Sequence, residues 1–134
     1  MLNQLTNVID FHGQALSLRS ERQRLIASNI ANADTPGYVA RDFSFAQALR
    51  EATGSAPLAG TLAATRGGHI SGATSARSEP RLLYATPSQT NLDRNTVDMD
   101  RERANFADNA VKYEATLRFI NGNVRMMLDA IKGQ

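Results

Sequence analysis

The side chains that most often carry out chemistry are few in this 134-residue chain and scattered along it. Its two histidines, His12 and His69, are far apart, and neither has carboxylates at a spacing typical of a metal site. His12 lies between Ile9 and Leu16 in an apolar pattern, which favours a packing role. Cysteine is absent, which excludes disulfides, thiolate metal ligands and a cysteine nucleophile.

The other candidates for catalysis have structural explanations. The carboxylates of DMDRERANFAD, residues 98–108, stand at the start of a helical pattern, where the helix dipole favours negative charge. Gly67-Gly68 lies in a polar segment without the flanking residues of a phosphate-binding loop, and indicates a turn. We therefore expect no enzyme activity, no cofactor, no metal site and no small-molecule substrate.

Charge and hydropathy exclude two further classes. The chain has 15 Lys and Arg against 13 Asp and Glu, with no basic run of the kind that nucleic-acid binding needs. Its longest apolar run, Leu82–Ala85, is far too short to cross a membrane. The N-terminus lacks the basic and apolar regions of a cleaved secretion signal.

The clearest pattern is a heptad seam that predicts a helix over residues 97–132. Its apolar positions alternate spacings of four and three residues: Phe106, Ala110, Tyr113, Leu117, Ile120, Val124, Met127 and Ile131. Asn95 or Thr96 is the expected N-cap, and Gly133 the expected end. Gly122 is unfavourable in the interior of such a helix.

A second helix is predicted over roughly residues 4–32. Its apolar seam is less regular and is formed by Leu5, Ile9, Leu16, Ile26 and Ile30. Halfway along, the seam is interrupted by Arg19, Arg22 and Gln23. A helix with such a polar waist is expected to contact several neighbours, some of them polar.

The predicted fold is one mainly α domain whose long N- and C-terminal helices pair as a coiled-coil-like bundle. Residues 1–33 hold the first helix, and 34–53 a turn, an extended exit and a short helix at 42–52. Residues 54–92 contain most of the glycines and prolines and few large apolar side chains, which predicts a flexible segment with minor β structure around Ile70 and Leu82–Tyr84. Residues 93–134 hold the last helix.

The stretch ASNIANADTPGYVARDF, residues 27–43, joins a helix end to a sharp turn. Its small and amide side chains suit a close contact, and Pro36-Gly37 favours a type II turn in which glycine supplies the positive φ. We expect an assembly motif here, formed by Asn29, Ala31, Asn32, Thr35, Pro36, Gly37 and Tyr38.

NIANADTPGY closely resembles the N-terminal signature of the bacterial flagellar axial proteins, the rod, hook and hook-associated family. The segment from Asn95 to Gly133 resembles the C-terminal helix of the same family, and the order of the two matches. The short length, the RDF at 41–43 and the Asn109-x-x-x-Tyr113-x-Ala115 pattern are most similar to the proximal rod proteins of the B type. One departure is Arg94, which stands where the family usually has glycine.

The resemblance implies a structural subunit of the proximal rod of the basal body, which polymerises helically and transmits torque across the periplasm. It also implies export through the flagellar type III apparatus without a cleaved signal. The implied partners are further copies of the chain, other rod proteins, an adaptor to the membrane ring and the export apparatus. The alternative is a free-standing coiled-coil binding module, such as an export chaperone or regulator, which should form a discrete dimer in solution.

Overall fold

The computed structural model describes residues 2–54, 80–84 and 92–133 of the chain. Three helices dominate: α1 (Leu2–Ala31), α2 (Phe45–Ala52) and α3 (Met99–Lys132). Strands β1 (Arg41–Asp42) and β2 (Leu83–Tyr84) form an antiparallel pair in which Arg41 lies opposite Tyr84. No helix in the described part of the chain is both long and apolar enough to span a bilayer.

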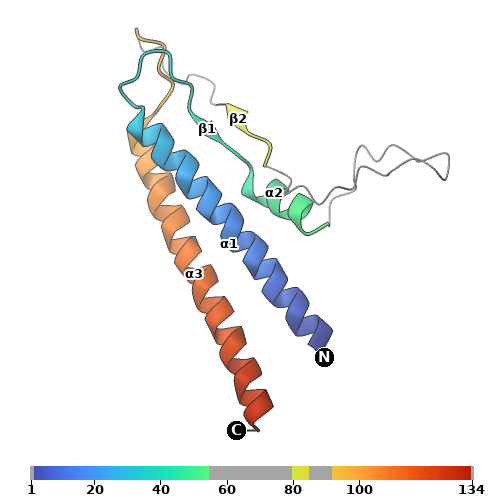
Figure 1. Ribbon diagram of the computed structural model, residues 1–134. Helices are drawn as coiled ribbons and strands as arrows, with labels where there is room; N and C mark the ends of the chain where they lie inside the picture. The colour runs from blue at the N-terminus through green and yellow to red at the C-terminus, as the bar shows by residue number, and fades with distance from the viewer. Residues whose placement is uncertain (1, 55–79, 85–91, 134) are drawn as a thin grey trace, which may run out of the picture.

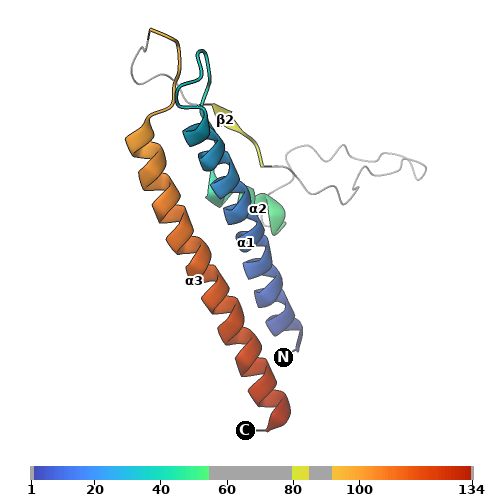
Figure 2. The ribbon, with the colours of Figure 1, turned by 60° about the vertical axis from the view of Figure 1, so that its left-hand side comes forward.

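Helices α1 and α3 lie side by side and antiparallel along most of their length (Figures 1 and 2). Helix α2 and strand β1 lie against α1, and β2 contacts only β1, whereas α3 packs against α1 alone among the helices and strands described (Figure 1). The first helix is therefore the central element, with α3 along one flank and the small α2–sheet unit on another. The long antiparallel pair confirms the predicted fold class.

The apolar core is small and lies between α1 and α2. Its buried members are Leu18, Leu25, Phe43 and Ala48, and the half-buried Phe45, Leu49 and Ala52 pack around them. Burial of this order stabilises a fold by about 25 cal/mol for each Å² of apolar surface removed from water. The core thus fixes α2 on α1, but it does not reach α3.

The contact between α1 and α3 is polar along its centre. The buried residues of α3 are Glu102, Asn109 and Thr116, each seven positions after the last. The predicted apolar seam runs beside this line. Its members Phe106, Leu117 and Val124 stay 37–39% exposed. Pairing of the helices therefore covers only one edge of that seam.

Element boundaries differ from the predicted ones at two points. Helix α2 starts at Phe45 rather than at residue 42, because Asp42 pairs with Leu83 in the sheet and accepts a hydrogen bond from the Phe43 amide. The N-cap of α3 is Asp98, not Asn95 or Thr96, and its carboxylate accepts from the amides of residues 100 and 101.

Other local predictions are confirmed. Strand β2 falls within the predicted Leu82–Tyr84, and α3 ends at Gly133, which has a φ of 72°. His12 is half-buried and stacks on Phe119 of α3, with ring centroids 5.9 Å apart. Ile70, His69, Gly67-Gly68 and most of the segment predicted to be flexible lie outside the described residues.

The departure at Arg94 has a structural cost. Its φ is 59°, the left-handed region that glycine adopts freely and that costs other residues about 1–2 kcal/mol. The chain therefore keeps the tight turn before α3 with a residue that is strained there.

Replacing Arg94 by glycine should stabilise the folded chain. Glycine removes the strain of about 1–2 kcal/mol but raises the entropy of the unfolded chain, which offsets about 0.5–1 kcal/mol. We expect a net gain of about 0.5–1 kcal/mol in the free energy of unfolding, measured from the urea midpoint at constant slope. Arg94→Ala, which keeps the strain, should give no gain. Equal gains from both variants would instead point to the arginine side chain.

Candidate functional site: the buried asparagines and the apolar face

The largest fully buried side chains in the described residues are Ile26 and three asparagines, Asn29, Asn95 and Asn109. A buried amide must find hydrogen-bond partners, because an unpaired one costs about 1–3 kcal/mol. The partners of these three join segments that are far apart in the sequence. The buried asparagines therefore hold the two ends of the chain together.

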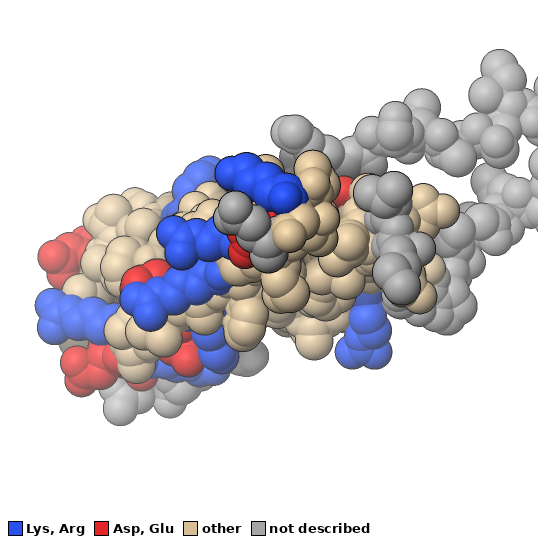
Figure 3. Space-filling view, turned by 90° about the horizontal axis from the view of Figure 1, so that it is seen from below, with Lys and Arg blue, Asp and Glu red and all other residues tan. Residues whose placement is uncertain are grey.

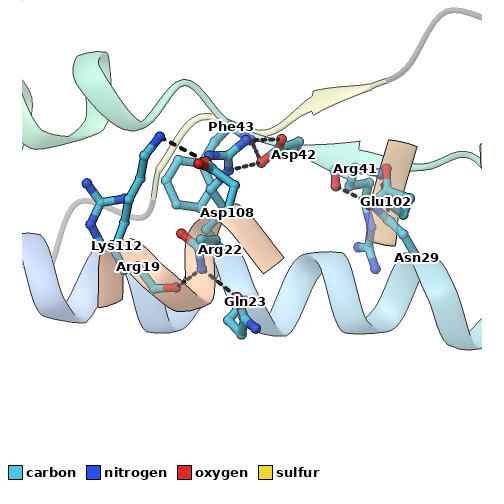
Figure 4. Close-up of polar contacts among 11 residues, drawn as sticks. Arg19, Arg22, Gln23, Asn29, Arg41, Asp42, Phe43, Glu102, Asp108 and Lys112 are labelled. Atoms are coloured by element: carbon cyan, nitrogen blue, oxygen red, sulfur yellow. Dashed lines mark hydrogen bonds and ion pairs between the residues drawn. The ribbon is translucent and has the colours of Figure 1, made fainter. Parts of the chain in front are cut away.

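Asn29 acts as a strand partner for β1 (Figure 4). Its Nδ2 donates to the carbonyl of Arg41 over 2.8 Å, and the Arg41 amide donates back to its Oδ1 over 3.0 Å. The same Nδ2 lies 3.2 Å from Oε2 of Glu102 in α3, and the hydroxyl of Tyr38 donates to Oδ1 over 3.2 Å. One side chain thus links α1, β1 and α3.

Asn95 caps the end of α1 from the other end of the chain. Its Nδ2 lies 2.8–2.9 Å from the carbonyls of Asn32, Ala33 and Thr35. The last carbonyls of a helix have no partner within the helix, and here a residue about sixty positions later supplies one. Its Oδ1 accepts from the Val97 amide, which fixes the approach to α3.

The turn after α1 is bound to the same remote segment. The Tyr38 amide donates to the carbonyl of Thr35, and Gly37 has a φ of 72°, so the predicted positive φ is confirmed. The Gly37 amide donates to the carbonyl of Asp93 over 2.7 Å, and the Thr96 amide donates to the carbonyl of Tyr38 over 3.0 Å. The turn therefore takes its direction from backbone pairing with residues 93–96.

Polar groups at the waist of α1 form hydrogen bonds with α3 and β1 of the same chain (Figure 4). Asn109 donates to the carbonyl of Arg19 over 2.9 Å and to Oε1 of Gln23 over 2.6 Å. Arg22 forms a bidentate pair with Asp42 at 3.0–3.1 Å, and this hydrogen bond is the main reason that the pKa of Arg22 is raised. The residues that interrupt the apolar seam thus position both α3 and β1.

Glu102 is the most buried carboxylate of the described residues, at 8% exposure. Burial raises its pKa above the ordinary value, and the nearby Asp42 acts in the same direction. The hydrogen bond from Asn29, together with Arg101 and Arg22, lowers it in part. The net effect is a raised pKa, so the Glu102 carboxylate binds a proton more tightly in the folded chain than in the unfolded chain.

The predicted assembly motif divides into an inner and an outer part. Asn29 is buried, whereas Asn32 and Tyr38 are half-buried, with Asn32 donating to the Ser28 carbonyl one turn earlier. The exposed members are Ala31, Thr35, Pro36 and Gly37. Asn29 is therefore engaged inside its own chain.

The predicted seams of the two helices form one surface. Leu16 lies two residues, and thus half a turn, from Leu18, which packs against α2, so Leu16 lies on the far side of α1. On α3, Asn105 lies on the side of the strands, because it lines a hollow together with residues of β1 and β2. Phe106 and Leu117 lie on the opposite side of the buried line of α3. We call this surface the apolar face: Leu5, Ile9, Leu16 and Ile30 of α1, and Phe106, Ala110, Tyr113, Leu117, Ile120, Val124 and Met127 of α3. Of the other seam residues, Ile26 is fully buried and Ile131 is 80% exposed at the end of α3.

Sequence reasoning found the residues of the apolar face but not the roles of the buried asparagines. Asn109 was part of a recognised pattern and Asn95 was expected to be a cap, yet the partner of each lies at the other end of the chain. A seven-residue spacing of polar side chains, Glu102, Asn109 and Thr116, was the one signal available in the sequence. The apolar seam beside it has the same seven-residue spacing, and that apolar pattern is the easier of the two to recognise in the sequence.

Asn29→Ala should destabilise the fold by about 3 kcal/mol. It removes both partners of the Arg41 backbone and leaves those groups and Glu102 unpaired, at about 1–3 kcal/mol for each buried group. The matched control is Asn32→Ala, which breaks bonds local to the end of α1 and should cost less than about 1 kcal/mol. Chemical denaturation of both variants measures the difference. Equal costs would contradict the bridging role of Asn29.

Glu102→Gln should remove a pH dependence of stability. Because the pKa of Glu102 is raised by folding, its contribution is fully present below the ordinary value of 4.5 and is lost as the pH rises through the folded-state pKa. The wild type should therefore lose stability relative to Glu102→Gln between pH 4.5 and neutral pH. Glu114→Gln, at an exposed carboxylate, is the control. A difference that stays constant with pH would show that Glu102 titrates normally.

Comparison with known proteins identifies relatives over nearly the whole chain. A family described as "Flagella basal body rod protein" matches residues 9–38, which span most of α1 and the turn after it. The flagellar basal body rod protein FlgB of Proteus mirabilis (strain HI4320) is 49% identical over 137 residues, covering 98% of each chain. FlgB of Salmonella typhimurium (strain LT2) is 44% identical over 140 residues and 99% of each chain, and FlgB of Escherichia coli (strain K12) is 42% identical over 139 residues and 98% of each chain. With identity of this extent along both chains, the chain belongs to the FlgB family of flagellar basal body rod proteins.

Proposed function

We propose that this rod protein polymerises helically in the proximal rod through its apolar face, and that the polymer carries torque across the periplasm. Membership of the FlgB family makes the chain a structural subunit of the basal body rod. The observation that supports the mode of assembly is the exposure of the apolar face. Leu5, Phe106, Leu117 and Val124 are each 37–39% exposed, although they belong to the predicted apolar seams of the two long helices.

The two sides of the helix pair differ in what covers their apolar residues. On the α2 side, the apolar residues of α1 are buried in the core. On the other side, α3 presents an unbroken apolar seam, with apolar side chains of α1 beside both of its ends, and soluble monomers rarely leave such a surface uncovered. Neighbouring subunits in a tube would cover it. Association through this face would release water from apolar side chains, which is the main driving force of protein assembly.

The charge pattern agrees with contact by packing. Seen from below, positive and negative side chains are intermixed, and uncharged side chains fill wide areas between them (Figure 3). Several charges on α3 are already paired within one helical turn, such as Lys112 with Asp108 and Arg118 with Glu114. Association of these helices would therefore depend on shape and apolar contact more than on attraction between fields of opposite sign.

The proposed partners are further copies of this chain, other rod proteins, the adaptor to the membrane ring and the export apparatus. The proposed location is the periplasmic rod of the basal body, reached through the flagellar export apparatus without a cleaved signal. Deletion of the gene tests the function. Basal bodies with membrane rings but no rod or hook, restored by the wild-type gene, are the expected result. Intact rods and normal swimming would favour the alternative of a free-standing coiled-coil module.

Leu117→Asp should abolish assembly while leaving the isolated subunit folded. The side chain lies on the apolar face, 37% exposed, so a carboxylate there stays hydrated in the free chain but is buried when a neighbour packs on it. We expect swimming to fall to the level of the deletion strain, with a loss of about 1–2 kcal/mol in the stability of the free chain from the partly buried leucine. The control is Asn121→Asp, at an exposed polar position of the same helix. Normal rods built from Leu117→Asp would contradict the role of the face.

A further inference from the structure

A second apolar surface lies on the outer side of α3. Val111, Phe119 and Met126 are 69%, 63% and 64% exposed, more than any residue of the apolar face. At 3.6 residues per turn they fall on one side of α3, with Ala115 and Gly122 between them. We call these five residues the outer stripe. Apolar side chains exposed to this extent along one helix are unusual on a soluble protein that works as a monomer.

The outer stripe and the apolar face lie on nearly opposite sides of α3. Five residues, or about 140° of rotation, separate Leu117 of the face from Gly122 of the stripe, and Phe119 stands about 160° from Leu117. Among the described elements α3 packs only against α1, and of the stripe only Phe119 has a ring contact with that helix, through His12. One subunit cannot therefore bring its own two apolar surfaces together.

The two glycines inside the long helices support a close approach at both surfaces. Gly13 in α1 and Gly122 in α3 each cost about 1 kcal/mol relative to alanine. A Cβ at either position would meet nothing within 4 Å in this chain, so contacts within the subunit give no reason for glycine there. Gly122 belongs to the outer stripe, and Gly13 adjoins Leu16 of the apolar face. Glycine at each position leaves room for another backbone to approach closely, and nothing in the described part of the subunit uses that room.

The shapes of the two surfaces are complementary. The outer stripe carries the bulky side chains Phe119 and Met126, which project into solvent. The apolar face is bordered on α1 by small exposed residues seven positions apart: Gly13, Ser20 and Ala27. Large side chains on one helix fit against a line of small ones on another, because the backbones then approach closely without voids.

We infer that the outer stripe of α3 packs onto the apolar face of a second copy of this chain, along the Gly13–Ser20–Ala27 line of α1. The inference rests on the proposed function. A polymer built from identical copies needs two contact surfaces on each copy, and the outer stripe is the second of them. A contact between two different patches of the same molecule is heterologous, and it repeats without closing when the copies are related by a screw axis. A second copy is the occupant because this chain carries both halves of the contact on opposite sides.

A photoreactive benzoylphenylalanine at Phe119 tests the identity of the occupant in living cells. The variant must first be shown to swim, and illumination should then produce a species of twice the subunit mass in purified basal bodies. Mass spectrometry should place the crosslink on α1, near Gly13, Ser20 or Ala27. A crosslink to the outer stripe of another copy, to a different protein, or to no protein in a swimming strain would overturn the inference.

Gly122→Leu gives an independent test. In the isolated chain the new side chain meets open space and favours the helix, so its melting temperature should be unchanged or higher. In the rod it should block the close approach and reduce swimming to the level of the deletion strain. Asn121→Leu, one position away and outside the outer stripe, should swim. If Gly122→Leu swims normally while Leu117→Asp does not, this inference fails and the proposed function stands.

Discussion

The requirement that buried amides be hydrogen-bonded determines most of this structure. Asn29, Asn95 and Asn109 are removed from water, and the Nδ2 group of each donates to a segment more than ten residues away, although Oδ1 of Asn109 has no hydrogen-bond partner among the described residues. A shift of α3 along α1 by one turn would separate Asn109 from Arg19 and Gln23, and Glu102 from Asn29, at about 1–3 kcal/mol for each group left unpaired. An apolar seam tolerates such a shift more easily, since one leucine can replace another. The amides therefore set a single register for the helix pair, and that register decides which apolar residues remain outside.

The division between polar and apolar surfaces follows from this register. The buried line of α3 is formed by Glu102, Asn109 and Thr116, of which Asn109 bonds to the polar waist of α1 and Glu102 to Asn29. The apolar seam is thereby turned partly away from α1 and joins the seam of the first helix on one side of the pair. Within the subunit, hydrogen bonds give specificity, and in the proposed assembly the apolar side chains supply the free energy of association between subunits.

Much of the fold could be predicted from local signals, because a helix, a helix end and a tight turn depend on residues close in sequence. The heptad spacing indicated the last helix, and Pro36-Gly37 indicated the turn and its positive φ. The errors arose where a side chain had a remote partner. Asn95 is a good N-cap by type, but it is engaged by the carbonyls at the end of α1, and Asp98 takes its place. For Asn29, predicted to belong to an assembly motif, the remote partner that the sequence did not reveal is the backbone of Arg41 in its own chain.

The most direct test of this account is an electron cryomicroscopy map of the rod in purified basal bodies, at a resolution that shows side chains. The account predicts that Asn29 contacts Arg41, and Asn109 contacts Arg19, within one and the same chain, and that Leu117 and Val124 are covered by a neighbouring chain. Amide contacts made instead between different subunits, or an apolar face left open to solvent in the assembled rod, would contradict it.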